Sequence, residues 1–346
     1  MESVKHTDVN KLGEFGLIDH LTQSFLIGQE STLKGIGDDG AVIKNISENT
    51  IVSTDMLVEG IHFDLIYTPL KHLGYKAIVV NLSDIYAMNA IPRQVTVSIA
   101  ISSKYSVEAL EELYEGMRKA CEFYHVDLVG GDTTSSPKGM ILSITALGQA
   151  NSEDIVYRSG ASKGDIICVT GDLGAAYLGL QILEREKRIF LEHPGMQPDL
   201  SKSEYLLERQ LKPEAQRDAI TYFSQNKIRP TAMIDVSDGL ASDLMHLCKQ
   251  SGAGAYIEEG KVPIHPETER TAIEFRLDPI TCALHGGEDY ELLFCIKEAD
   301  LEKIRFMPDV FIIGEITEAE AGISLHTTGG QIVPLEAQGW NHFRTS

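Results

Sequence analysis

The sequence lacks the features that mark several protein classes. Its five cysteines form no C-x-x-C pair, which disfavours a structural zinc site and a disulfide framework. Lys and Arg total 30 against 51 Asp and Glu, and nucleic-acid phosphates are held by basic patches, so a nucleic-acid partner is not expected. The N-terminus has no apolar signal segment, and no apolar run approaches the ~18 residues of a membrane span. We therefore expect a cytoplasmic protein without a membrane partner.

Known nucleotide-binding motifs are also missing. There is no G-x-x-x-x-G-K-[ST] loop and no H-R-D or D-F-G set, which excludes a Walker-type NTPase and a protein kinase. The stretch GIGDDGAVI (35–43) does spell G-x-G-x-x-G, but STLK precedes it and a strand-like AVI follows it. The dinucleotide fingerprint needs the opposite order, a strand before and a helix after, so we interpret this match as a decoy.

The length of 346 residues and the alternation of strand and helix patterns predict two mixed α/β domains. Residues 50–55 and 95–101 are predicted strands, and residues 73–88 a largely buried helix. Residues 106–124 are predicted as an amphipathic helix with Ser106 as its N-cap. The polar stretch 151–165 suggests a boundary between an N-terminal domain, 1–150, and a C-terminal domain, 151–346.

Apolar strands in this sequence repeatedly end in carboxylates. IVSTD ends in Asp55, LVGGD in Asp132 and AMID in Asp235, with Asp238 opening a helix soon after. The carboxyl ends of strands are where α/β proteins place ligands. The adjacent pair Asp38 and Asp39, and Asp84 inside the apolar helix, extend the set.

Converging carboxylates need a cation. Two of them 4 Å apart repel by about 4 kcal/mol at an effective dielectric near 20. The available ligands are the oxygens of Asp, Ser and Thr, which favour Mg²⁺ over zinc. Because Mg²⁺ held this way is usually shared with phosphates, the pattern predicts a nucleotide or another polyphosphate as ligand.

Each acid also has a structural interpretation. Asp238 could be a helix N-cap, Asp84 a buried hydrogen-bonded acid, and Asp38 or Asp39 an ordinary turn former. Asp55 and Asp132 could simply end their strands.

Fewer residues are candidates for holding the phosphates or the acceptor. Arg158 in YRSGASKGD could clamp a phosphate or be a surface arginine. The glycines of GGD (130–132) and GGED (286–289) allow backbone N–H groups to approach a ligand. His62 is as compatible with a structural role, and Trp340 could be a packing anchor or stack on a ring.

Eight segments together resemble one family. They lie between residues 35 and 343 in the order GIGDDGAVI, STDMLVEGIHF, NLSDIYAM, GGDTT, RSGASKGD, IDVSDGLASDL, GGEDYEL and GWNHF. This set is similar to thiamine-monophosphate kinases, of the aminoimidazole ribonucleotide synthetase-like ATP-binding superfamily. The resemblance implies two α/β domains, a homodimer formed through the N-terminal sheet, several Mg²⁺ ions, and ATP with thiamine monophosphate as substrates.

The resemblance also implies roles for individual residues. The family's metal ligands correspond to Asp39, Ser53, Thr54, Asp55, Asp84, Asp132, Asp235 and Asp238. Its ATP contacts correspond to Tyr114, Gly131, Arg158 and Ser237. Its thiamine-phosphate contacts correspond to His62, Glu288 and Trp340.

Three positions depart from the family pattern: Asn89 replaces a usual glycine, His285 a usual small residue, and Trp340 a usual tyrosine. The segment 188–230 carries little motif information. Two alternatives stay open: another ATP-dependent synthetase of the same superfamily, and a non-catalytic protein that binds a metal or nucleotide.

Overall fold

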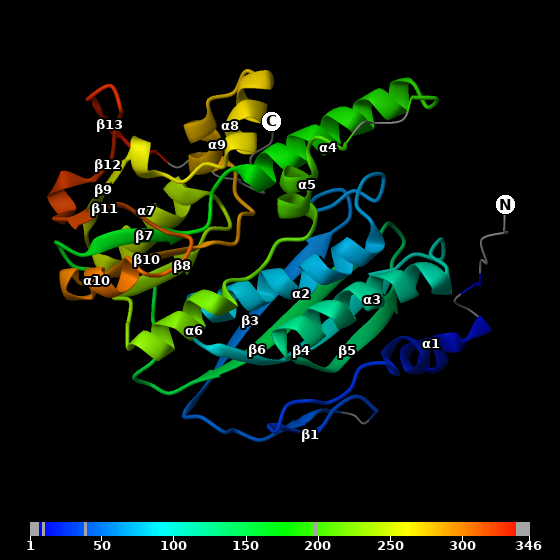
Figure 1. The fold of residues 1–346 in the computed structure, drawn as a ribbon. Helices are drawn as coiled ribbons and strands as arrows, with labels where there is room; N and C mark the ends of the chain where they lie inside the picture. Colours follow the sequence, from blue (N-terminus) through cyan, green and yellow to red (C-terminus); the bar gives the residue numbers. More distant parts are fainter. Residues whose placement is uncertain (1–6, 9–10, 38–39, 197–199, 337–346) are drawn as a thin grey trace. The chain divides into compact units, whose positions relative to one another are not determined.

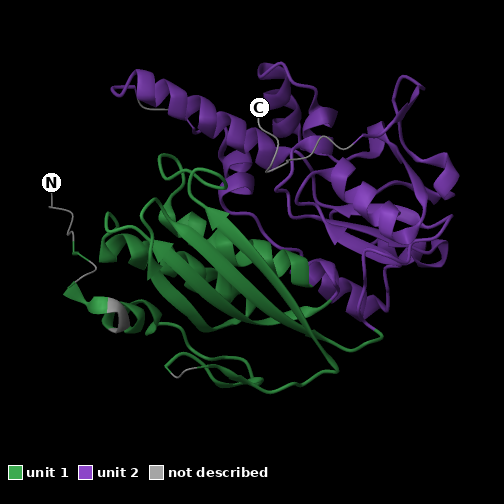
Figure 2. Cartoon of the chain, turned by 180° about the vertical axis from the view of Figure 1, so that it is seen from behind, with its two compact units in different colours: residues 1–85, 90–153 green, residues 86–89, 154–346 purple. Residues whose placement is uncertain are grey.

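The computed structural model describes residues 7–8, 11–37, 40–196 and 200–336. The chain divides into two compact units, residues 1–85 with 90–153 (unit 1) and residues 86–89 with 154–346 (unit 2; Figure 2). Each unit combines a sheet with helices (Figure 1), which confirms the expected mixed α/β fold class. Among the described residues, no helix is both long and apolar enough to cross a bilayer.

Unit 1 is built on a four-stranded sheet in the order β3-β6-β4-β5, with only the β4–β5 pair parallel. Helices α2 and α3 cover one face of it (Figure 1). The elements of this unit are α1 (Gly13–Thr22), β1 (Thr32–Lys34), β2 (Val42–Ile43), β3 (Asn49–Val58), α2 (Leu70–Ala87), β4 (Ile91–Ile101), α3 (Val107–Tyr124), β5 (Asp127–Ser135) and β6 (Ile141–Ala150).

Alternation along the strands separates the two faces of this sheet. In β6, Leu142, Ile144 and Ala146 are buried, and the residues between them are half-buried. On the other face of edge strand β3, Val52 is 61% exposed and Met56 is 55% exposed. This sheet therefore has one helix-covered face and one open face within unit 1.

Unit 2 contains a seven-stranded sheet in the order β13-β12-β9-β11-β7-β10-β8. Its longer elements are β7 (Ile166–Thr170), α4 (Ala175–Glu192), α5 (Glu204–Leu211), α6 (Arg217–Asn226), β8 (Ala232–Asp235), α7 (Leu240–Ser251), β9 (Gly254–Glu258), α8 (Pro266–Glu274), α9 (Pro279–His285), β10 (Leu292–Ile296) and β11 (Val310–Thr317). Its shorter elements are α10 (Leu301–Ile304), β12 (Ile323–His326), β13 (Ile332–Pro334) and the 3-10 helices η2 (Glu259–Lys261), η3 (Glu298–Asp300) and η4 (Ala319–Ala321). Its core joins strand residues such as Ile167 and Leu293 to Leu244 and Leu247 of α7.

Several local expectations are confirmed. The predicted helix 73–88 is α2, and the predicted strands 50–55 and 95–101 lie within β3 and β4. Ser106 caps α3, because its hydroxyl accepts from the backbone N–H of Ala109 at 3.3 Å. Asn89 has φ +55°, a left-handed conformation that asparagine adopts more readily than most residues, which explains how it can stand where glycine is usual.

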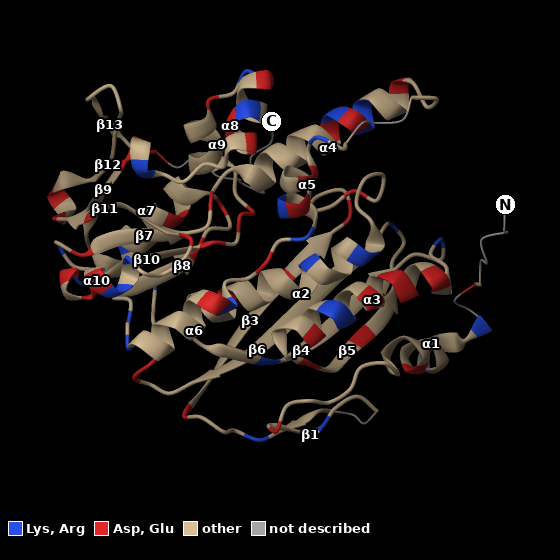
Figure 3. Cartoon of the chain, in the orientation of Figure 1, with Lys and Arg blue, Asp and Glu red and all other residues tan. Residues whose placement is uncertain are grey.

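The cysteine side chains of both units are buried. All five cysteines are free and buried. Cys121 lies on α3 of unit 1, whereas the other four belong to unit 2. Acidic residues, by contrast, are spread along the chain, for example on α3 and α10 (Figure 3), and only six Asp or Glu residues of the described part are buried.

We predict that Gly116→Ala lowers the free energy of unfolding by about 1–3 kcal/mol, as expected for overpacking. Helices α2 and α3 approach so closely that a Cβ at Gly116 would lie 1.9 Å from the carbonyl oxygen of Lys71. Denaturant unfolding measures the change. The control is Gly16→Ala in α1, where the nearest neighbour is 3.6 Å away and no loss is expected. An unchanged midpoint for Gly116→Ala would contradict this packing.

Candidate functional site

In unit 1, the first part of the candidate site is a pair of carboxylates on the helix-covered face of the sheet. Asp55 comes from β3 and Asp84 from α2, three residues after Asn81. The side-chain oxygen of Asn81 accepts from the backbone N–H of Asp55 at 3.0 Å, and its amide donates to Ala77 at 3.0 Å. The Ser53 hydroxyl donates to Asp84. The buried Asn81 thus fixes the strand against the helix that carries the second acid.

This pair has the electrostatics of a cation site. Burial, together with the charge of Asp84 and a hydrogen bond between the two carboxyls, raises the pKa of Asp55 to about 6. One proton is therefore held where two negative charges would otherwise meet. A divalent cation can replace that proton, so the donor set fits Mg²⁺.

Thr54 belongs to the opposite face. Its hydroxyl donates to the Ile144 carbonyl at 2.9 Å and accepts from the Thr145 hydroxyl at 3.0 Å. A metal shared with Asp55 could therefore take only a main-chain oxygen from Thr54. The role of Thr54 as a metal ligand stays a prediction, limited to its main-chain oxygen.

Asp132 and Gly131 lie on β5, at the other edge of the sheet from β3. Three strand spacings separate these edges, about 14 Å. The register pairs Asp132 with Ser98 and Gly131 with Val97, which puts Asp132 on the open face. Within one copy of unit 1, Asp132 and Asp55 therefore do not meet.

Two further predicted residues of unit 1 stand apart from this pair. The Nδ1 atom of His62 accepts from the backbone N–H of Val58 at 3.0 Å, which places the ring proton on Nε2. Tyr114 is buried on α3 with its ring edge-to-face against Phe25, and burial raises its pKa to about 12. Neither contact tests a role in binding.

In unit 2, a five-residue loop carries Asp235, Ser237 and Asp238. Asp235 ends β8 and is buried, whereas Asp238 is exposed. The carboxylate of Asp243, in the first turn of α7, accepts from the backbone N–H groups of Ser237 and Asp238 at 3.1 and 3.2 Å. The N-cap of α7 is Gly239 and makes no side-chain cap, so the alternative interpretation of Asp238 as a helix cap is wrong.

The same loop is fixed from a second segment. The carbonyl of Ser237 accepts from the N–H of Glu288 at 2.8 Å, and the carbonyl of Val236 accepts from Tyr290 at 2.9 Å. Burial and the nearby charges of Asp235 and Asp238 raise the pKa of Asp243 to about 8. The backbone of the loop is thus held from two sides, by Asp243 of α7 and by the segment 288–290.

The remaining predicted residues are scattered. Arg158 is exposed in the loop before β7. Asp39 and Trp340 lie outside the described residues. Within the described ranges, no three His, Cys, Asp or Glu side chains are grouped closely enough to hold a metal ion. The structure therefore brings together Ser53, Asp55 and Asp84 in unit 1, and Asp235, Ser237, Asp238 and Glu288 in unit 2.

Sequence reasoning missed the residues that support these groups. Asn81, Asp243 and Gln210 each hydrogen-bond to a predicted site residue. Asn81 is a polar residue within the apolar run of α2, and Asp243 lies within the segment IDVSDGLASDL, so both carried a readable signal. Gln210 carried none, because its partner is 78 residues away.

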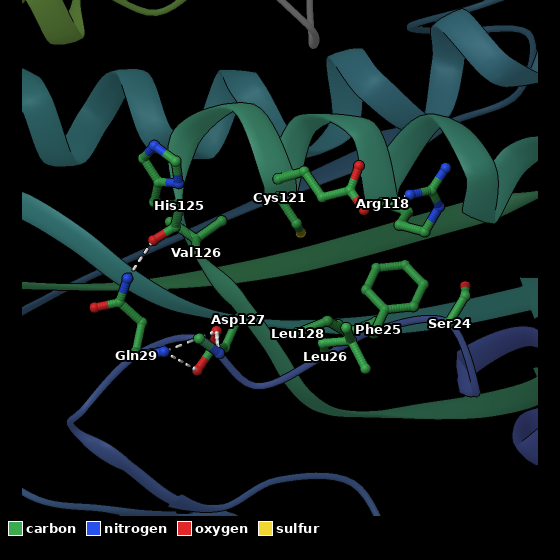
Figure 4. A pocket seen from close by; sticks show the side chains of 12 residues that line it. Ser24, Phe25, Leu26, Gln29, Arg118, Cys121, His125, Val126, Asp127 and Leu128 are labelled. Carbon is green, nitrogen blue, oxygen red and sulfur yellow. Dashed lines mark hydrogen bonds and ion pairs between the residues drawn. The ribbon is translucent and has the colours of Figure 1, made fainter.

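A pocket in unit 1 does not coincide with these residues. It has a volume of about 270 Å³ and lies between α3 and the segment 24–29 (Figure 4). Two acids line it, Glu122 and Asp127, and Asp127 already accepts from the backbone N–H groups of Gly28 and Gln29 at 2.8 and 3.0 Å. Asp127 therefore fixes the segment 24–29 against the sheet. No predicted site residue lines this pocket.

Comparison with known proteins identifies the domains. Residues 37–150 match the AIR synthase related protein N-terminal domain, and residues 162–325 match the corresponding C-terminal domain. Two domains of this family thus account for most of the chain.

Relatives match over nearly the whole length. The chain is 33% identical to the thiamine-monophosphate kinase of Bacillus subtilis, over 96% of this chain and 100% of that protein. It is 35% identical to the enzyme of that name from Aquifex aeolicus, over 97% and 99% of the two chains. A solved structure described as AaThiL complexed with AMPPCP and TMP has a TM-score of 0.74 at 32% identity, covering 99% of this chain and 100% of that chain.

We predict that Mg²⁺ stabilises the protein more at pH 8 than at pH 5. A folded-state pKa of about 6 for Asp55, above its ordinary 3.8, gives stability that is present below pH 4 and is lost as the pH rises through 6. Mg²⁺ competes with that proton, so its stabilising effect should grow over the same range, reaching about 2.7 kcal/mol when its concentration is about 100 times Kd.

Thermal unfolding with and without millimolar Mg²⁺ at the two pH values measures this difference. Asp84→Asn is the matched control, since it removes the second carboxylate and should remove most of the pH-dependent gain. An equal Mg²⁺ effect at pH 5 and pH 8 would contradict a metal at this pair.

Proposed function

We propose that this chain, which belongs to the thiamine-monophosphate kinase family of AIR synthase related proteins, transfers the γ-phosphate of ATP to thiamine monophosphate and forms thiamine diphosphate. The observation that carries the proposal is the match to kinases of that name through both domains, over 96–97% of the chain. The reaction is a phosphotransfer with a phosphate group as acceptor.

The chemistry asks little of an acid or base. The acceptor is the phosphate of thiamine monophosphate, which is ionised at neutral pH and needs no deprotonation. Direct in-line transfer then depends on position and on relief of the repulsion between two anions. This agrees with a site whose described residues offer the carboxylates of Asp55 and Asp84 and the hydroxyl of Ser53.

Several Mg²⁺ ions complete the proposal. When bound, they would neutralise the phosphate charges of donor and acceptor. We assign them to Asp55, Asp84 and Ser53 of unit 1 and to Asp235 and Asp238 of unit 2. Asp39, Thr54 and Asp132 complete the set of proposed ligands.

A second set of residues is proposed to contact the two substrates. Tyr114, Gly131, Arg158 and Ser237 would contact ATP, where Arg158 supplies a cation for phosphate oxygens. His62, Glu288 and Trp340 would contact thiamine monophosphate. The Nε2–H of His62 is a donor for a substrate oxygen, and the carboxylate of Glu288 suits a cationic thiamine ring system.

We also propose a homodimer. Asp55 and Asp132 lie on opposite edges and opposite faces of one sheet, so the open face that carries Asp132 is the surface a second copy would cover. Edge strand β3 is ten residues long, and its open face carries Val52 and Met56. Long apolar edges of this kind are normally covered. We propose that two unit 1 sheets pack through these open faces.

We predict ADP formation that requires thiamine monophosphate and Mg²⁺. Asp55→Asn should lower kcat by two or more orders of magnitude, because removal of one electrostatic stabiliser costs about 10²–10³ in kcat. Coupled ADP detection with a thermal unfolding control measures both. ADP formation that ignores thiamine monophosphate would favour another synthetase of the superfamily, and Mg-ATP binding without turnover would favour a non-catalytic protein.

We predict that Met56→Lys yields a monomer with little activity, since a charge on the open face opposes burial in the dimer. Light scattering and the ADP assay measure the two effects. Ile273→Lys is the control, as Ile273 is 63% exposed on α8 of unit 2, outside the unit 1 sheet. A Met56→Lys dimer with full activity would contradict this arrangement.

A further inference from the structure

The segment that carries Glu288 has an unusual backbone. Gly287, Glu288 and Tyr290 have φ values of +72°, +58° and +53°. Non-glycine residues adopt this region at a cost, and two of them within three residues persist only where the surroundings hold them. The hydrogen bonds to Val236 and Ser237 hold one side of the segment. The other side is held by residues from a part of the chain without sequence motifs.

That part is α5, within the segment 188–230. Helix α5 packs on α4 at Gly179, where a Cβ would lie 2.2 Å from the Leu206 carbonyl oxygen and 2.9 Å from the Cβ of Gln210. This close approach sets the position of Gln210. Its side chain is 5% exposed.

Two neighbouring residues of α5 reach the strained segment. The Gln210 amide donates to Oε2 of Glu288 at 2.8 Å. The guanidinium of Arg209 pairs with Glu291 at 2.8 Å and donates to the Asp289 carbonyl at 3.4 Å. The Asp289 carboxylate accepts from the backbone N–H of Gly174 at 2.8 Å, just before α4. Arg209 and Asp289 therefore anchor the backbone, and Gln210 acts on the Glu288 carboxylate itself.

We propose that Gln210 is a positioning residue that orients the Glu288 carboxylate toward thiamine monophosphate. The inference rests on the proposed function, in which Glu288 contacts that substrate. The amide fixes one carboxylate oxygen and thereby the plane of the group. A fixed carboxylate loses less side-chain entropy when the substrate binds. The hydrogen bond of Gln210 reaches Glu288, which is proposed to contact thiamine monophosphate and not ATP, so its effect should be larger for that substrate.

The test is Gln210→Leu, which keeps a similar volume and removes the donor. We expect KM for thiamine monophosphate to rise about tenfold, the effect of losing a hydrogen bond to a charged group, with KM for Mg-ATP changed less than about twofold. Gln216→Leu is the matched control. Its amide makes the same kind of bond to Glu291, at 2.6 Å, and not to Glu288, so KM for thiamine monophosphate should not change selectively.

A double-mutant cycle separates positioning from stability. If Gln210 acts through Glu288, then Gln210→Leu has no further effect on KM for thiamine monophosphate in a Glu288→Gln background. Additive effects, or equal changes in both KM values, would overturn the inference. Gln210→Glu replaces Gln210→Leu if the latter does not fold: it places a like charge on Glu288 and should raise KM further, and an unchanged KM would overturn the inference.

The unsubstituted enzyme distinguishes this inference from its premise. Absence of turnover dependent on thiamine monophosphate would overturn the proposed function and the role of Gln210 together. A normal unsubstituted enzyme with no selective effect of Gln210→Leu would overturn the role of Gln210 alone.

Discussion

The structure of the candidate site depends on keeping like charges close together. Asp55 and Asp84 repel each other, and a chain free to relax would move them apart. The buried amide of Asn81 prevents this by joining β3 to α2 beside the pair. The glycine contacts between α2 and α3 then set the position of α2 on the sheet. Packing between α2 and α3, away from the acids, thus keeps Asp55 and Asp84 close together despite their mutual repulsion.

The two units solve this problem in the same way. In unit 1, Asn81 accepts from the N–H of Asp55, and in unit 2, Asp243 accepts from the N–H groups of Ser237 and Asp238. In both, a buried polar side chain on a helix fixes the backbone that presents an acid. The backbone at each acid is thereby held through main-chain N–H groups and not through the carboxylate of the acid.

Much of this could be predicted from local sequence. Alternating and apolar runs predict β3, β4 and α2, and the acids stand out because each follows an apolar run directly. The expectation that they end their strands is confirmed for Asp235 and wrong for the other two, since β3 continues past Asp55 to Val58 and β5 past Asp132 to Ser135. Which acids share a face could not be predicted, since that depends on register and strand order. Thr54 follows Ser53 directly but points to the other face, and Asp132 stands at the opposite edge from Asp55.

Long-range support was also beyond local patterns. Asp238 has the sequence of a helix cap, but the side chain that completes the turn is Asp243, and the cap position is Gly239. Gln210 contacts Glu288 only because α4 and α5 pack at Gly179. Such contacts follow from tertiary packing, and a segment without motifs can still supply them.

The burial of every cysteine has a consequence for experiments on motion. A thiol reagent can reach these sulfur atoms only when the surrounding structure opens, since burial also raises the pKa of thiols such as Cys168 and keeps them unreactive. Labelling rates in the native protein therefore measure transient opening. Cys121 belongs to unit 1 and the other four cysteines to unit 2. Mass spectrometry of labelled peptides would therefore measure the transient opening of each unit separately, without an introduced probe.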